Sequence, residues 1–360
     1  MPPYLTPIKF SLFLLVSLCS LSCAAIAYAQ DPGFLPTDEI EISKPNTGTT
    51  ARLKGEIIDF NGEELHFRGG ANERVQYFST KEILQTRYQQ SPEHQQAVEL
   101  LEQKKYAEAE RILETAIHVE PREWVRRELL ALQIRAALGT FDYEKAGNRF
   151  IALCASDEKT RHFNLIPLNW RIPEVDTEPG MAVFVGEVPE ATALRWFNDE
   201  EPVAQLLGAS WLMFREPDDG KLSQKFVQLT RNMNDRIQRA AQMQVWRTHV
   251  EAGRYSEIEL KRWETRVEAT DDLDRGGPYY LLATAYARQL QHDRAAVRWL
   301  WLKANHAPDH LLSSDAQLQA GKALIESGRT SQGLFVYREL AAAYPESPAG
   351  KAALEQITSP

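Results

Sequence analysis

The stretch "LEQKKYAEAERILETAIHVEP", residues 101–121, carries apolar residues at fixed offsets. Ala109 is followed by Leu113 four residues later, then by Ala116, and Pro121 closes the stretch. Residues three and four apart share one face of a helix, so these side chains form a stripe that can pack on a neighbouring helix. Pro121 prevents the helix from continuing. The stretch therefore predicts the second helix of a packed helical hairpin.

Related spacings recur along the chain. Ala146 and Phe150 repeat the Ala109–Leu113 spacing 37 residues further on. Near the C-terminus the pattern returns in Tyr279, Leu282, Ala283, Tyr286, Ala295, Trp299, Gly321, Leu324, Gly333, Tyr337 and Pro345. On these residues the chain resembles the tetratricopeptide repeat (TPR) family, and its last helical stretch, 342–357, resembles the closing helix of exported bacterial proteins of this class. The resemblance implies stacked helical hairpins with a concave binding groove.

A different periodicity precedes the helical part. Residues 51–60 and 63–68 alternate apolar with polar side chains, and Asn61-Gly62 joins them. Asn-Gly between two alternating runs favours a β-hairpin with a type I′ turn, which needs positive φ at both central residues. Residues 49–92 are therefore predicted to form a small antiparallel, SH3-like β module that docks on the helices behind it. Its expected apolar face comprises Leu53, Ile57, Leu65, Phe67, Val75 and Tyr77.

The N-terminus has the features of an export signal. Lys9 precedes the apolar run 10–18, and Ala27-Tyr28-Ala29 fits the small-residue cleavage pattern, so residues 1–29 are predicted to be a secretory signal peptide. No stable membrane span is then expected after cleavage. Two alternatives stay open: residues 10–29 form an uncleaved membrane anchor, or Cys23 is lipidated. Each version places the protein outside the cytoplasm, in the periplasm or beyond.

The rest of the chain divides by composition. Residues 30–48 are predicted to be a linker, 93–160 N-terminal TPR-like hairpins, 161–200 an irregular proline-rich insert, and 201–357 a C-terminal α-solenoid. The fold class is therefore mainly α, with a TPR-like α-solenoid behind the small β module. The net charge of −9 argues against a nucleic-acid partner, because phosphate binding depends on Lys and Arg.

Catalytic and metal-binding motifs are sparse in this sequence. It contains no glycine-rich phosphate loop and no His-Glu-x-x-His, and the pair His306 and His310 is interrupted by Pro308, which favours a turn over a zinc site. No cofactor or metal is expected. Cys154 is the single cysteine outside the export signal and is predicted to be a buried, unreactive side chain.

A partner-binding groove is predicted from the repeat register. Tyr280, Thr284 and Arg288 are four residues apart on one face of a first repeat helix, the side that faces the groove in the TPR family, and Lys322 is the expected neighbour on the next repeat. Arg127 and Arg135 form a basic strip that is a weaker candidate for the same role.

Three functions compete at this stage. The favoured hypothesis is a non-enzymatic scaffold that binds a protein or peptide in the concave groove. The alternative is an envelope hydrolase with Arg161, His162, Trp170, Glu174 and Asp176 gathered in the insert, since paired carboxylates can act as acid and base. The third hypothesis is a purely structural component of the cell envelope.

Overall fold

The computed structural model describes residues 38–44, 48–69, 74–172, 187–305 and 310–358, with only the backbone of His310 and Leu311. These residues belong to one compact unit. The predicted signal peptide, residues 1–29, lies outside the described residues. Among the described residues, every helix is too short or too polar to be a candidate membrane span.

The N-terminal part is an antiparallel five-stranded sheet with the strand order β4-β3-β2-β1-β5. Its strands are β1 (Asp38–Lys44), β2 (Thr49–Phe60), β3 (Glu64–Gly69), β4 (Val75–Ser79) and β5 (Ile83–Arg87). A short 3₁₀ turn, η1 (Thr80–Glu82), joins β4 to β5, which crosses over to pair with β1. This arrangement is SH3-like, as predicted. The module begins earlier than predicted, because β1 lies within the stretch 30–48 that was assigned to the linker.

The Asn61-Gly62 turn joins β2 to β3 as predicted, but for a different physical reason. The backbone of Gly62 is not in the left-handed region, and Asn61 Oδ1 instead accepts hydrogen bonds from the amides of Glu63 and Glu64 at 2.9 and 3.0 Å. A Cβ atom on Gly62 would lie 1.5 Å from the carbonyl oxygen of Lys159. Glycine is therefore required here by the close approach of another backbone segment.

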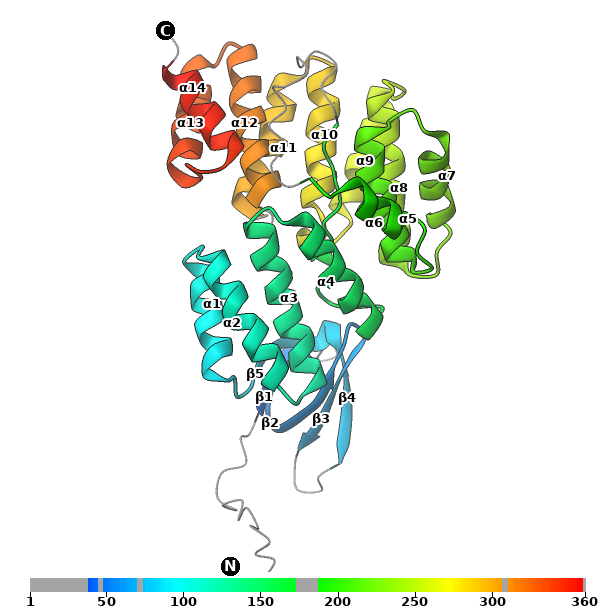
Figure 1. The fold of residues 1–360 in the computed structure, drawn as a ribbon, viewed down its shortest axis with the longest axis vertical. Coiled ribbons are helices and arrows are strands. Elements are labelled where there is room, and N and C mark those ends of the chain that lie inside the picture. Colours follow the sequence, from blue (N-terminus) through cyan, green and yellow to red (C-terminus); the bar gives the residue numbers. More distant parts are fainter. Residues whose placement is uncertain (1–37, 45–47, 70–73, 173–186, 306–309, 359–360) are drawn as a thin grey trace, which may run out of the picture. The chain divides into compact units, whose positions relative to one another are not determined.

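Four helices follow the sheet and pack in sequence order, each on the next (Figure 1). They are α1 (Pro92–Glu102), α2 (Tyr106–Val119), α3 (Glu123–Gly139) and α4 (Tyr143–Ser156). The stripe predicted from the sequence points inward, because Ala109, Leu113 and Ala116 of α2 are all buried. The 101–121 stretch therefore forms the turn and second helix of a hairpin, as expected.

The sheet docks on these helices, which confirms the expected docking of the β module. Ile40, Ile57, Leu65 and Phe67 share one apolar cluster with side chains of α1, α2 and α3. The indole Nε1 of Trp124 on α3 donates to the carbonyl oxygen of Ile57 at 3.1 Å. The predicted apolar face is wrong at Val75 and Tyr77 on β4, which are exposed because they lie opposite Arg68 and His66, on the face of the sheet away from Leu65 and Phe67.

The predicted irregular insert at 161–200 contains more regular secondary structure than expected. After the 3₁₀ turn η2 (Phe163–Leu165) the chain runs without regular structure to Ile172, and residues 163–172 are called the connector below. Residues 173–186 lie outside the described part, and a helix then starts within the predicted insert. The helices of this region are α5 (Glu190–Phe197), α6 (Pro202–Arg215), α7 (Gly220–Leu229), α8 (Asp235–Glu251) and α9 (Glu257–Glu268).

The C-terminal helices again pack each on the next (Figure 1). After the 3₁₀ turn η3 (Asp272–Asp274) they are α10 (Gly276–Arg288), α11 (His292–Asn305), α12 (His310–Glu326), α13 (Thr330–Ala343) and α14 (Pro348–Thr358). One apolar cluster extends from Ala131 on α3 to Val336 on α13. The two repeat-like regions therefore share a core, and the fold is a mainly α, helical-repeat-like structure preceded by a small antiparallel sheet.

Candidate functional site

A cavity of about 290 Å³ lies beside the first helices of two successive C-terminal hairpins, α10 and α12. It is lined by Ile172, Tyr280, Thr284, Ala287, Arg288, Leu290, His292, Trp299, Gln319, Lys322, Ala323 and Glu326. The four residues predicted for the groove in this region therefore line a single cavity. Whether they bind a partner stays a prediction.

Tyr280, Thr284 and Arg288 share one face of α10 because they are four residues apart. The hydroxyl of Tyr280 donates a hydrogen bond to the carboxylate of Asp315 on α12, so this pair ties the two walls of the cavity together. Thr284 Oγ1 donates to the carbonyl oxygen of Tyr280 at 3.0 Å, which satisfies its hydroxyl within the helix. Tyr280 and Thr284 thus contribute shape and a fixed wall.

Arg288 is positioned by the C-terminal end of α8. Its Nη1 donates to the carbonyl oxygens of Val250 and Glu251 at 3.0 and 3.2 Å, and a cation at these carbonyls is favoured by the helix dipole. Burial raises the pKa of the Glu251 carboxyl, and the positive charges of Arg247 and Arg288 oppose this shift. Arg288 therefore has a structural role in addition to its place in the cavity wall.

Lys322 is an exposed cation in the cavity wall. Its side chain is exposed on α12, and within the described ranges its ammonium group has no hydrogen bond or ion pair. Glu326, one turn further along α12, pairs instead with His292, whose Nδ1 lies 3.0 Å from Glu326 Oε2. Lys322 is therefore available to a negatively charged group that enters the cavity.

Trp299 contributes a buried aromatic ring to the same cavity. This side chain belongs to the second-helix pattern and is only 4% exposed. Its indole Nε1 is buried as well and has no hydrogen-bond acceptor among the described residues. The ring therefore lines the cavity mainly as apolar surface.

The cavity wall combines the cations Arg288 and Lys322 and the His292–Glu326 pair with apolar surface. Ile172, Ala287, Leu290 and Ala323 supply apolar surface, and Leu290 is 78% exposed in the turn after α10. Such a lining suits an extended segment that offers a carboxylate or carbonyl oxygen and a small apolar side chain.

The other two groove candidates lie elsewhere. The prediction for Arg127 was wrong, because its side chain is buried between α3 and the sheet, where it pairs with Asp59 and donates to the carbonyl oxygen of Phe60 at 3.3 Å. Arg127 therefore holds the β module to the helices. Arg135 is exposed on α3 and does not line the cavity.

The residues of the alternative hydrolase site are only partly described. Arg161 and His162 both contact Glu128 on α3, with Arg161 Nε and His162 Nε2 at 3.2 and 2.9 Å from its Oε1. Trp170 instead lines a different cavity. Glu174 and Asp176 lie outside the described residues, as does His306 of the His306–His310 pair.

Ile172, Trp299, His292 and Glu326 were missed as lining residues of the cavity. Ile172 reaches it through the connector, a contact that no local pattern indicates. Trp299 follows Ala295 in the second-helix pattern, which predicts burial but does not show that its indole N–H is left without an acceptor. His292 and Glu326 lie 34 positions apart, about one repeat, and that spacing is the one signal that could have paired them.

Comparisons with known proteins add little. No protein-family model matches the sequence, and no curated protein matches it significantly. A solved structure of the Assembly Chaperone of RpL4 (Acl4), residues 1–338, aligns with 74% of this chain and 95% of its own chain, at 16% identity and a TM-score of 0.30. A TM-score of this size carries no argument for the function of the present chain.

Proposed function

We propose that this protein is a non-enzymatic, TPR-like scaffold that binds an extended peptide or a partner surface in the cavity beside α10 and α12. The observation that carries the proposal is the convergence of Tyr280, Thr284, Arg288 and Lys322 on one cavity of about 290 Å³. A stack of helical hairpins offers such concave surfaces for extended ligands.

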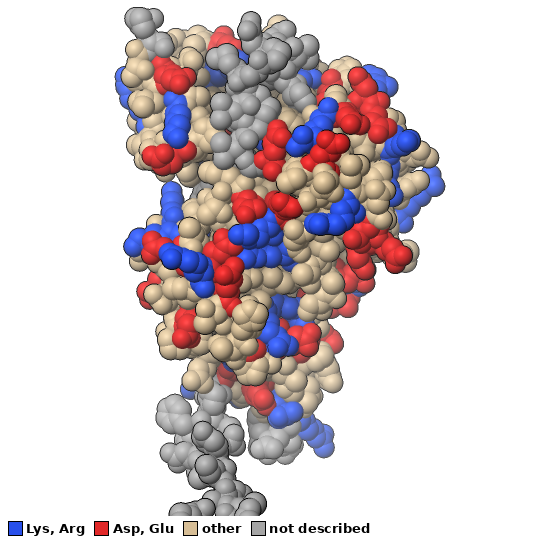
Figure 2. All heavy atoms as spheres, in the orientation of Figure 1, with Lys and Arg blue, Asp and Glu red and all other residues tan. Residues whose placement is uncertain are grey.

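The lining indicates the chemistry of the partner. Arg288 and Lys322 favour a carboxylate, either an acidic side chain or a free C-terminus, and the Trp299 ring favours an apolar group beside it. Figure 2 shows acidic and basic side chains interspersed on the face it presents. Together with the net charge of −9, this mixture supports a protein partner over a polyanion such as nucleic acid.

The place of action is part of the same proposal. Residues 1–29 have the charge, apolar run and cleavage pattern of a signal peptide, which supports export to the periplasm or cell envelope. The intact mass of the protein recovered from the cell envelope tests this directly. Loss of the first 29 residues is expected, whereas a full-length mass would favour the anchor and an added lipid mass on Cys23 would favour the lipoprotein.

Binding is tested by affinity capture from envelope extracts with quantitative mass spectrometry. Two variants disturb the cavity without removing a contact between helices: Lys322→Glu reverses an exposed charge of its wall, and Thr284→Arg fills its space. Lys221→Glu, at an exposed position in the first turn of α7, is the matched charge-reversal control. Partners that are captured by the wild type and the control but reduced about tenfold or more with both cavity variants would support the proposal.

Synthetic peptides from a captured partner then test the chemistry. Replacing their carboxylates by amides is expected to weaken binding to the wild type and to have little further effect on Lys322→Glu. A partner that all variants retain equally, or amidated peptides that bind as tightly as acidic ones, would exclude this cavity as the binding site.

A further inference from the structure

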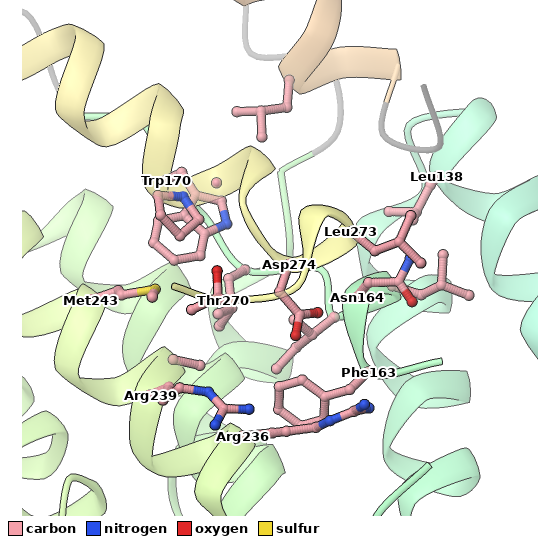
Figure 3. Close-up of a pocket in the computed structure, with 17 residues that line it drawn as sticks. Leu138, Phe163, Asn164, Trp170, Arg236, Arg239, Met243, Thr270, Leu273 and Asp274 are labelled. Carbon is pink, nitrogen blue, oxygen red and sulfur yellow. The ribbon is translucent and has the colours of Figure 1, made fainter. Parts of the chain in front are cut away.

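A second cavity is lined in part by the connector and shares no lining residue with the cavity beside α10 and α12 (Figure 3). Its volume is about 60 Å³. Its walls come from α8, from the turn between α9 and α10, and from the connector, with Leu138 of α3 and Leu312 of α12 at its margin. Apolar side chains dominate these walls and include Phe163, Leu165, Ile166, Leu168, Trp170, Met243 and Pro278.

Three charged groups from two elements face this cavity. Arg236 and Arg239 come from α8, and Asp274 comes from η3. In Figure 3 the two arginine side chains approach from below and the Asp274 carboxylate points down towards them, with the Trp170 ring above. Two cations and one anion thus surround a mainly apolar space.

These charges are not neutralised by direct hydrogen bonds to one another. Among the described residues, neither the Arg239 guanidinium nor the Asp274 carboxylate has a hydrogen-bonding partner, although both border the cavity. Arg236 uses Nη1 to donate to the carbonyl oxygen of Thr160, and its guanidinium lies 5.8 Å from the centre of the Phe163 ring. Burial raises the pKa of the Asp274 carboxyl, and the charges of Arg236 and Arg239 counter this effect. Both signs of charge are therefore available to a bound molecule.

The aromatic wall is fixed by close packing. The Trp170 indole rests on Gly277, where an added Cβ atom would lie 2.0 Å from Trp170 Cε2. Its neighbour Asn169 is anchored through its carbonyl oxygen, which accepts from Arg247 Nη1 at 2.8 Å. The indole is only 8% exposed, so the cavity is bounded by a preformed surface.

We propose that this cavity binds a small free α-amino acid of the size of glycine or alanine. The carboxylate of the amino acid would bind the guanidinium groups of Arg236 and Arg239, and its ammonium group would bind the carboxylate of Asp274. The Cα and a methyl side chain would contact Trp170 and Met243. This site is separate from the cavity beside α10 and α12, and neither proposal depends on the other.

Size and charge both lead to this ligand class. One water needs roughly 10–15 Å³ by this measure of volume, so about 60 Å³ admits roughly four to six non-hydrogen atoms. A simple carboxylate would leave Asp274 facing a second anion, and a simple amine would offer no negative charge to the two arginines. Arg239 is exposed, and Arg236 and Asp274 are half-buried, so the discrimination comes from charge complementarity at a partly solvated site: a zwitterion offers an opposite charge to all three groups.

Isothermal titration calorimetry on the full mature chain tests the proposal. The probes are glycine and L-alanine, with acetate and methylamine as the two half-ligands and L-leucine as the oversized analogue, each up to tens of millimolar. Saturable binding of glycine or alanine is expected, with each half-ligand and leucine binding at least about tenfold more weakly.

Matched variants assign the site. Asp274→Asn and Arg239→Gln are each expected to weaken amino-acid binding roughly ten- to a hundredfold, since each removes one charge-assisted contact. Asp271→Asn in the same turn and Arg262→Gln on α9, both at exposed positions, should leave binding unchanged. Denaturation midpoints confirm that all four variants fold.

Two results would overturn the assignment. One is acetate binding as tightly as glycine with no effect of Asp274→Asn, which would indicate a simple anion site. The other is the absence of saturable binding for every probe with the folded wild type. Neither result bears on the partner-binding cavity, whose variants are at Lys322 and Thr284.

Discussion

Glu128 on α3 is the centre of a buried ion cluster between the helices and the sheet. Arg161 Nη2 lies 2.5 Å from Glu128 Oε2, and His162 Nε2 lies 2.9 Å from Glu128 Oε1. The Arg161 guanidinium in turn lies 4.2 Å from the centre of the Phe60 ring in β2. The carboxylate thus orients a cation that packs on the β module.

The magnitude of this interaction follows from the pKa of Glu128. Burial raises that pKa, but the hydrogen bonds and positive charges of His162 and Arg161 outweigh it and hold the pKa at about 2, below the ordinary value of 4.5. Since one pKa unit corresponds to about 1.4 kcal/mol, the ionised carboxylate contributes roughly 3 kcal/mol to stability at neutral pH. A carboxyl group whose pKa is lower in the folded than in the unfolded protein stabilises the fold at pH values above the unfolded pKa. This contribution is therefore lost as the pH falls from about 4.5 towards 2.

Glu128→Gln is the perturbation that tests this reasoning. At about pH 7 the variant is expected to lose roughly 3 kcal/mol of unfolding free energy, and its deficit relative to the wild type should shrink as the pH falls below about 4.5. Urea denaturation over a pH series measures both quantities. Glu123→Gln on the same helix is the control, because Glu123 is 66% exposed and its 3.6 Å pair with Arg127 is expected to contribute less than about 1 kcal/mol.

The result that refutes the argument is specific. If Glu128→Gln stays within about 1 kcal/mol of the wild type at neutral pH, the cluster does not stabilise the carboxylate as its geometry implies. A deficit that is constant from about pH 6 to about pH 3 would also refute it, since the loss would then come from packing rather than from charge.

Two further predictions concern the turn at Gly62 and the thiol of Cys154. Gly62→Ala is expected to lower the unfolding free energy by at least about 2 kcal/mol in urea denaturation, because its Cβ would meet the Lys159 carbonyl oxygen. Gly220→Ala is the control and should change stability by less than about 0.5 kcal/mol, since an added Cβ there has no atom within 4 Å. Equal effects of the two substitutions would contradict the close approach at Gly62. Burial raises the pKa of the Cys154 thiol to about 12, so a thiol reagent at about pH 8 should label it only after unfolding. Rapid stoichiometric labelling of the folded protein would contradict this prediction.

The parts of the fold that could be predicted are those set by local periodicity. Ala109, Leu113 and Ala116 are buried on one helix face because their spacing matches the helical repeat, whatever lies elsewhere in the chain. The same holds for Tyr280, Thr284 and Arg288, whose spacing alone places them on one face of α10. Lys322 joins them because the next repeat presents the equivalent position.

The parts that could not be predicted depend on contacts between distant residues. Arg127 was a candidate for the partner-binding groove, but its partner Asp59 is 68 positions away on β2, and no local pattern indicates that pair. The strand Asp38–Lys44 was assigned to a linker because proline and threonine surround it, and its pairing with both β2 and β5 is non-local. The charges around the smaller cavity come from α8 and η3, which meet only once the helices are packed.

The connector explains how two chemically distinct cavities come to share a wall. Arg247 has no exposed surface, and its Nη1 donates to the carbonyl oxygens of Asn169 and Ser210 at 2.8 and 2.9 Å. Burial lowers the pKa of Arg247 to about 10, so the charge is kept at neutral pH despite its cost in a dry interior.

An apolar side chain in place of Arg247 would remove one donor from each of these carbonyl groups, although the Asn169 oxygen would still accept from Ser210 Oγ at 3.1 Å and Gln244 Nε2 at 3.4 Å. Trp170, next to the anchored residue, faces the smaller cavity, and Ile172 faces the larger one. A change at Arg247 would therefore disturb both cavities together, whereas Arg239 and Lys322 each line only one. Substitutions at Arg239 and Lys322 can separate the two proposals, and a substitution at Arg247 cannot.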